Sequence, residues 1–76
     1  MTITKKYYKM QRKDIAIVQF LIEGHEGMAT VTTIDSDGAV ILVSIMNDFI
    51  SQMENVINHI KFRYSLNEID DYEINY

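Results

Sequence analysis

The residues best suited to metal chemistry in this sequence are two histidines and a pair of glutamates close in the chain. Glu23, His25 and Glu26 lie within one short segment, and His59 is the only other histidine. Imidazole nitrogens and carboxylate oxygens are ordinary zinc ligands. Their spacing, however, reproduces no HExxH or other ligand motif. Glu23 and Glu26 also stand at a helix end next to Gly27, where the helix dipole favours His25 when it is protonated, so we expect no metal site.

No other set of residues indicates catalysis. The three glycines are scattered and form no phosphate-binding loop. The chain has no cysteine, which excludes thiolate nucleophiles and thiolate metal ligands. The serines lack the Gly-x-Ser-x-Gly setting of an activated nucleophile; they are Ser36, Ser44, Ser51 and Ser65. We therefore expect that the protein is not an enzyme and uses no cofactor.

Basic and aromatic residues gather near the N-terminus, a combination that also occurs on RNA-binding sheets. The basic residues lie around Tyr7 and Tyr8; they are Lys5, Lys6, Lys9, Arg12 and Lys13. The glycine–aromatic pattern of RNA-binding domains is missing. The net charge of −4 also opposes attraction to phosphates. We expect no nucleic-acid partner.

A polar corner of four residues is the best candidate for a ligand site. Gln11, Arg12, Lys13 and Asp14 directly precede the apolar run that begins at Ile15. Free backbone N–H groups, the positive end of a helix and two cations can hold a carboxylate there. The alternative is a solvated loop in which Asp14 caps the helix.

The composition is that of one ordinary domain spanning residues 1–76. Of the residues, 47% are hydrophobic and 24% are charged, which is too apolar for a disordered chain. No apolar run approaches the roughly 20 residues of a membrane-spanning helix. The N-terminal residues lack the layout of a signal peptide. These features predict a cytoplasmic protein without a membrane partner.

Apolar periodicity and turn residues predict six elements. The first two are a tyrosine-containing strand over residues 4–10 and a helix over residues 15–26, with Gly27 as its left-handed C-cap. Two β-branched strands follow over residues 28–34 and 39–45, and the Asp-Gly dipeptide between them predicts a tight hairpin. The hairpin would pair Ile34 with Ile41 and Thr32 with Val43.

The second half of the chain predicts another helix and a last strand. Apolar residues at three- and four-residue steps indicate the helix; they are Phe49, Met53, Val56, Ile60 and Tyr64. Asn47 or Asp48 would cap it. Beyond Asn67, three apolar residues alternate with polar ones as in a half-exposed strand; they are Tyr72, Ile74 and Tyr76.

The order strand, helix, strand, strand, helix, strand predicts an α+β, ferredoxin-like β-α-β-β-α-β sandwich. In that fold a four-stranded antiparallel sheet runs fourth, first, third, second strand, and both helices cover one face. The basic first strand then lies beside an acidic last strand, and each opposite-charge pair contributes about 0.2–1 kcal/mol. The acids are Glu68, Asp70, Asp71 and Glu73.

The other face of this sheet would be open. The third strand offers Val40 and Leu42 to one side and the alternate apolar residues to the other. A large apolar patch is rare on monomers, so we expect a homodimer with two-fold symmetry. We assign these candidates to the open face: Tyr7, Ile41, Val43 and Ile45. The alternative is a monomer shielded by lysine and tyrosine stems.

The stretch DIAIVQFLIEGHEGMATVTTID, from Asp14 to Asp35, resembles a family of short bacterial proteins of unknown function. Its members carry a similar LEG-aromatic-EG-x-A-x-V-x-T-x-D stretch, and the likeness extends from Lys13 to about Ile60. The order of elements is also similar to that of an ACT domain, a small regulatory module that dimerises and often binds amino acids. The resemblance places such a ligand near the loop between the first strand and the first helix, where this chain has Asp14 but no glycine.

Together these features predict a non-catalytic regulatory or ligand-binding module that acts as a homodimer. Its ligand would be a small amino-acid-like molecule at the corner formed by Gln11, Arg12, Lys13 and Asp14. The alternative is a structural or interaction protein whose open sheet face docks a partner protein and which binds no ligand. A metal-dependent site at Glu23, His25 and Glu26 is a third and weaker hypothesis.

Overall fold

The computed structural model describes residues 3–25 and 27–70. Its strands are β1 (Ile3–Lys9), β2 (Ala29–Asp35), β3 (Val40–Met46) and β4 (Asn67–Ile69). Its α-helices are α1 (Ile15–Glu23) and α2 (Ile50–Tyr64), each preceded by one 3-10 turn, η1 (Arg12–Asp14) and η2 (Asn47–Phe49). The element order β-α-β-β-α-β is therefore the predicted one.

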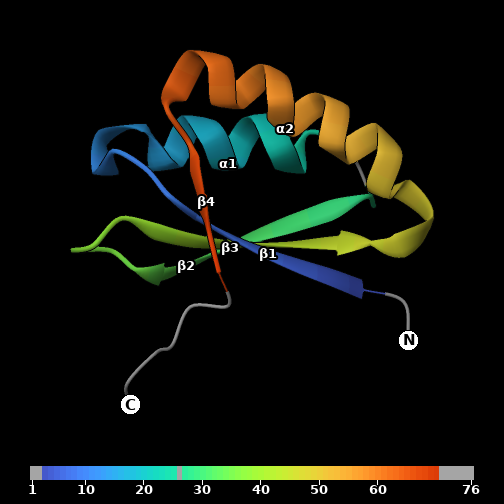
Figure 1. Ribbon diagram of the computed structural model, residues 1–76, viewed down its shortest axis with the longest axis horizontal. Helices are drawn as coiled ribbons and strands as arrows, with labels where there is room; N and C mark the ends of the chain where they lie inside the picture. Colours follow the sequence, from blue (N-terminus) through green and yellow to red (C-terminus); the bar gives the residue numbers. More distant parts are fainter. Residues whose placement is uncertain (1–2, 26, 71–76) are drawn as a thin grey trace.

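The four strands form one antiparallel sheet in the order β2-β3-β1-β4. Figure 1 shows both helices on the same side of this sheet, with α2 and α1 running side by side above it. The predicted α+β sandwich, its strand order and the placement of both helices on one face are confirmed. Strands β3 and β1 are the central strands of the sheet, because each has a strand on both sides.

The core lies between the helices and the sheet, and it takes alternate residues from each strand. Tyr8 of β1 pairs with Ile41 of β3, and Val31 of β2 pairs with Val43. These side chains join buried residues of both helices, including Val18, Ile22, Met53 and Ile57, in one cluster. Such pairing is the expected result of a two-residue side-chain period.

The assignment of Ile41, Val43 and Ile45 to the open face is wrong. All three side chains are fully buried in the cluster that contains the helix residues. Lys6 pairs with Val43 and reaches Glu54 of α2, which independently places this side of β3 under the helices. Tyr7, the fourth candidate, does lie on the open face, since it alternates with the buried Tyr8.

The first helix is shorter than predicted. It ends at Glu23, and Gly24 is its C-cap with a right-handed φ of −64°. Gly27 has the expected left-handed backbone, with φ 79°, but it lies in the turn that leads to β2. The glycine therefore shapes the entry to the strand and does not end the helix.

The predicted hairpin forms, but its register differs by one residue. Val31 lies opposite Val43 and Thr33 opposite Ile41, with an irregularity between Thr33 and Asp35. The Asp35 carboxylate accepts a hydrogen bond from the backbone N–H of Gly38 at 2.9 Å. The left-handed Ala39, with φ 56°, completes the turn. This bulged turn uses more residues than the predicted two-residue loop.

The second helix begins later than predicted. Asn47 and Asp48 form η2, and the N-cap of α2 is Phe49, with no side-chain capping hydrogen bond. The predicted apolar stripe is nevertheless the face that packs on the sheet, where Met53, Ile57 and Ile60 are buried.

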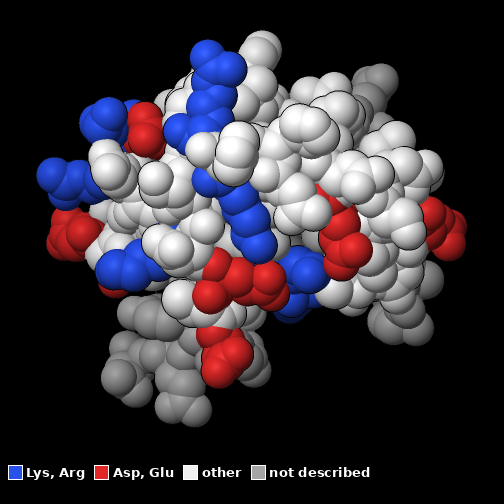
Figure 2. All heavy atoms as spheres, turned by 45° about the horizontal axis from the view of Figure 1, so that its top comes forward, with Lys and Arg blue, Asp and Glu red and all other residues white. Residues whose placement is uncertain are grey.

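The last strand begins at Asn67, earlier than the alternating residues on which its prediction rested, and its described part ends at Ile69. Tyr72, Ile74, Tyr76, Asp71 and Glu73, which the sequence analysis also assigned to it, lie outside the described residues. The expected charge pairing between the first and last strands occurs through Lys6, whose Nζ lies 3.9 Å from Glu68 and 3.4 Å from Glu54. Figure 2 shows acidic and basic side chains close together on this side of the molecule.

Candidate functional site

The polar corner Gln11–Asp14 lies between β1 and α1 on the surface. Gln11, Arg12 and Lys13 are exposed, and Asp14 is half-buried. The backbone N–H of Asp14 donates to the Gln11 carbonyl at 2.9 Å, which closes the turn of η1. Neither Gln11 nor Asp14 makes a side-chain capping hydrogen bond. Asp14 is the N-cap residue of α1, as the alternative predicted, but its side chain makes no capping hydrogen bond.

The two cations of this corner already have acidic neighbours. Arg12 Nη1 lies 3.5 Å from Asp37 Oδ1, in the β2–β3 turn, and Lys13 Nζ lies 4.0 Å from Asp14 Oδ1. Arg12 and Asp37 are both strongly exposed, so water weakens their attraction. A ligand carboxylate at this corner would compete with Asp37 for the guanidinium.

The acidic residue Glu23, considered above as a metal ligand, has a structural role. Its Oε2 accepts a hydrogen bond of 2.8 Å from the backbone N–H of Val31, and its Oε1 accepts one of 3.3 Å from Gln19. Glu26 lies outside the described residues. Within residues 3–25 and 27–70, no group of three or more His, Asp or Glu side chains is arranged to hold a metal ion.

The open face of the sheet carries a row of apolar side chains across three strands. Tyr7 of β1 lies between Leu42 of β3 and Ile69 of β4, and all three are half-buried. Further along the same face, beyond the polar pair Lys5–Ser44, Ile3 pairs with Met46, and their exposed fractions are 48% and 39%. We call these five apolar residues the sheet patch.

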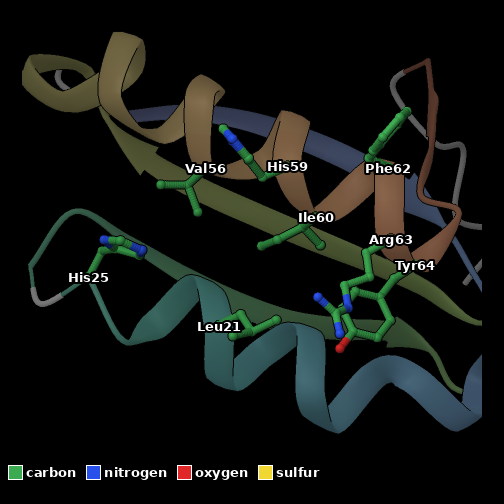
Figure 3. A pocket seen from close by; sticks show the side chains of 8 residues that line it. All are labelled: Leu21, His25, Val56, His59, Ile60, Phe62, Arg63 and Tyr64. Carbon is green, nitrogen blue, oxygen red and sulfur yellow. The ribbon is translucent and has the colours of Figure 1, made fainter.

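A second surface, on the helical layer, was missed by the sequence analysis. It is a groove of about 660 Å³ between α1 and α2. Figure 3 shows Val56 and Ile60 pointing from α2 into this space, with Leu21 of α1 facing them. Arg63 and Tyr64 extend from α2 toward α1 at one end, and His25 stands at the other end. His59 and Phe62 form the outer rim on α2.

The side chains of this groove that can carry a charge near neutral pH are basic. Among the residues that the structure describes, its lining contains one arginine and two histidines but no aspartate or glutamate, although the whole chain carries a net charge of −4. Among the described residues, no carboxylate lies within ion-pair distance of Arg63. His59 Nδ1 lies 2.8 Å from the carbonyl oxygen of Asn55. Because a carbonyl only accepts, Nδ1 carries the proton and Nε2 remains available.

The helical spacing of the α2 residues could have indicated this groove. Val56, Ile60 and Arg63 are separated by four and three positions, so they lie on one side of the helix. Val56 and Ile60 belong to the apolar stripe predicted from the sequence, whereas no role was predicted for Arg63. The missing information is the position of α1, because only the packed pair of helices creates a concave surface.

One tyrosine of the core has a strongly altered titration. Tyr8 is almost completely buried beneath α2, and Lys61 Nζ lies 5.8 Å from its ring centroid. Burial raises the pKa of the Tyr8 phenol far above its ordinary value, and the negative charges of Glu68 and Glu54 raise it further. The phenol is therefore a neutral group of the core and not a proton donor or acceptor near neutral pH.

These features define a class first: a small two-layer α+β domain with one sheet face open and a basic, apolar groove on its helical layer. Within that class, the chain belongs to a family described as a domain of unknown function, DUF4911, whose model matches residues 8–63. This confirms the expected membership in a family of unknown function. The match spans the polar corner and nearly all of the groove.

The other comparisons identify no relative. No curated protein and no solved structure matches the chain. In the part of the chain that the structure describes, neither helix is long and apolar enough to cross a membrane.

Proposed function

We propose that this protein is a non-catalytic binding module that acts as a homodimer through the open face of its sheet. The observation that carries the proposal is the sheet patch, formed by Ile3, Tyr7, Leu42, Met46 and Ile69 on the face away from the helices. A chain of this length buries only about 60% of its unfolded surface by itself. Association would remove the remaining apolar side chains from water.

The rim of this face carries charged groups. At the β1–β4 edge, Lys5 and Asp70 border the same shallow concavity. Charges of both signs at one rim suit a two-fold interface, in which each patch meets a copy of itself.

A dimer provides a way for ligand binding on one surface to affect a partner on another. The polar corner formed by Gln11, Arg12, Lys13 and Asp14 remains a candidate for a small amino-acid-like ligand, with the guanidinium of Arg12 as its carboxylate partner. The alternative is an interaction module without a small ligand, in which the sheet patch docks a different protein.

The test of the dimer is the solution mass, measured by light scattering at protein concentrations between 1 and 100 µM. A dimer with a dissociation constant of ~10⁻⁶ M, which corresponds to a binding free energy of about 8.2 kcal/mol, dissociates within this range. We expect a mass of twice 8.9 kDa at the upper end. The double variant Ile3→Lys/Met46→Lys places charges in the sheet patch, and we expect it to be monomeric. Both residues are exposed, so the change does not disturb the core.

The matched control is Phe62→Lys, which makes the same kind of substitution on the helical layer. Phe62 is 96% exposed, and the dimer should persist in this variant. A mass near 8.9 kDa for the unmodified protein at all concentrations would contradict the proposal. So would a dimer that Phe62→Lys disrupts and the double variant does not.

A further inference from the structure

We propose that the groove between α1 and α2 binds a small amphipathic carboxylate, with the apolar body on Leu21, Val56 and Ile60 and the carboxylate at Arg63. The inference names a site and a ligand class for the binding module proposed above, and it rests on that proposal. The groove belongs to the helical layer, so its ligand and the proposed dimer partner would occupy opposite sides of the molecule.

The size and lining of the groove suit a small molecule. Its volume of about 660 Å³ falls within the roughly 300–1,000 Å³ of typical ligand sites. The middle of the groove is aliphatic, because Val56 and Ile60 face Leu21 across the gap between the helices. Polar groups stand only toward the ends and the outer rim. This arrangement of an apolar centre with a few polar groups is characteristic of ligand sites.

The charges of the groove select an anion. Arg63 extends into one end, and no carboxylate of the described residues pairs with it. A guanidinium offers parallel N–H donors that match the two oxygens of a carboxylate. Among the described residues, no acidic side chain lines the groove and would repel such a ligand.

The two histidines place imidazole rings at the opposite end and the rim. The backbone of His25 is held in place because its N–H donates to the Ile22 carbonyl at 3.3 Å and its carbonyl accepts from Met28 at 3.1 Å. The His59 ring is oriented by the contact between its Nδ1 and the Asn55 carbonyl. Groups that are fixed in place before binding lower the entropy lost when a ligand is ordered.

The polar corner is the competing location for a carboxylate, and its geometry is less favourable. Arg12 already lies 3.5 Å from Asp37, and both side chains are strongly exposed. A ligand there would have to displace an acidic neighbour and would gain little from desolvation. Arg63 is also exposed, but it stands beside apolar side chains and faces no described acid, so a ligand there would displace none.

The experiment titrates octanoate into isotope-labelled protein and follows the backbone amide resonances by NMR. Octanoate has the required apolar body and terminal carboxylate, while 1-octanol has the same body without the charge and acetate has the charge without the body. We expect octanoate to shift the amides of residues 21–25 and 56–64, with an affinity at least about tenfold above that of 1-octanol. Acetate should cause no comparable shifts.

Arg63→Gln provides the decisive variant, because it removes the charge from an exposed residue and leaves the core intact. We expect it to weaken octanoate at least about tenfold and to leave 1-octanol unchanged. Arg12→Gln, the same substitution at the competing polar corner, distinguishes the two carboxylate locations, because it would weaken octanoate only if the carboxylate were bound at that corner.

Three results would overturn the inference. They are equal affinities for octanoate and 1-octanol, unchanged octanoate affinity in Arg63→Gln, and loss of binding in Arg12→Gln instead. The last result would place the carboxylate at the polar corner. The oligomeric state is measured on the same samples, so a dimer that fails to bind octanoate contradicts the groove site alone. A monomer that binds octanoate contradicts only the dimer.

Discussion

The carboxylate of Glu23, at the end of α1, accepts a hydrogen bond of 2.8 Å from the backbone N–H of Val31 in β2. Strand β2 lies at the edge of the sheet and pairs only with β3. Unpaired N–H groups on an edge strand can recruit another chain. Glu23 therefore fixes the end of α1 to the edge and satisfies one of these donors.

Replacing Glu23 with alanine should lower the free energy of unfolding by about 1–3 kcal/mol, because the Val31 N–H loses a charged acceptor. The Glu23→Gln variant retains an acceptor oxygen and should lose less. Urea unfolding measures both changes, and amide exchange at Val31 should accelerate selectively in Glu23→Ala. Equal stability of the alanine variant and the unmodified protein would show that water replaces the carboxylate without cost.

The buried Tyr8 phenol should make the protein sensitive to alkaline pH. Its pKa is raised by burial first and then by Glu68 and Glu54, whereas the unfolded chain releases the proton near pH 10. Below about pH 10 the phenol is protonated in both states, so its contribution to stability is fully present. Above that pH only the unfolded chain loses the proton, and stability falls by up to about 1.4 kcal/mol per pH unit.

The Tyr8→Phe variant tests this prediction, because it removes the titrating group and keeps the ring in the core. We expect a smaller loss of stability above pH 10 than in the unmodified protein, measured by urea unfolding at several pH values. The Glu68→Gln variant removes one cause of the raised pKa and should reduce the slope partially. The same steep slope in Tyr8→Phe would assign the effect to other groups.

The topology could be predicted from the sequence because local signals agree with one another. The β-branched runs on either side of the Asp37-Gly38 dipeptide identify a hairpin. The three- and four-residue spacing of Met53, Val56 and Ile60 identifies the second helix. Lys6 and Glu68 also lie on strands that the predicted order makes neighbours, and their 3.9 Å separation agrees with that order.

The error on the open face and the error in the hairpin register are consistent with each other. A shift of one residue exchanges the two faces of a strand. In the predicted register Val43 lies opposite Thr32, whereas in the structure it lies opposite the buried Val31. The bulge between Thr33 and Asp35 causes the shift. The alternation of side chains along a strand separates the residues of β3 into two faces, but it does not show which face the helices cover.

The groove could not be predicted, because its two walls come from helices far apart in the sequence. Leu21 and Ile60 meet only after both helices have packed on the sheet. Helical periodicity places Arg63 on the same side of α2 as Ile60. Helical periodicity does not show that α1 lies beside this side of α2, or that the described acidic residues lie outside the groove.

The hairpin turn should be sensitive to Gly38. A Cβ atom at this position would lie 2.6 Å from Asp35 Oδ2, so the carboxylate would have to move and lose its hydrogen bond to the Gly38 N–H. We expect Gly38→Ala to destabilise the protein by about 1 kcal/mol or more. In an Asp35→Ala background the same substitution should cost less, and a double-mutant cycle measured by urea unfolding gives the difference. Additive effects would show that the turn relaxes without this contact.

The end of α2 should accept a stabilising substitution at Ser65. This exposed residue has a left-handed backbone, with φ 58° and ψ 46°, and its N–H donates to the Lys61 carbonyl at 3.1 Å. Glycine adopts this conformation without a Cβ clash, so Ser65→Gly should raise the free energy of unfolding by up to about 1 kcal/mol. Each kcal/mol raises the thermal midpoint of such a domain by about 4–8 °C. The matched control Ser65→Ala keeps the Cβ atom and should not raise the free energy of unfolding. Equal thermal midpoints for the two variants would show that the left-handed backbone at Ser65 carries no measurable strain.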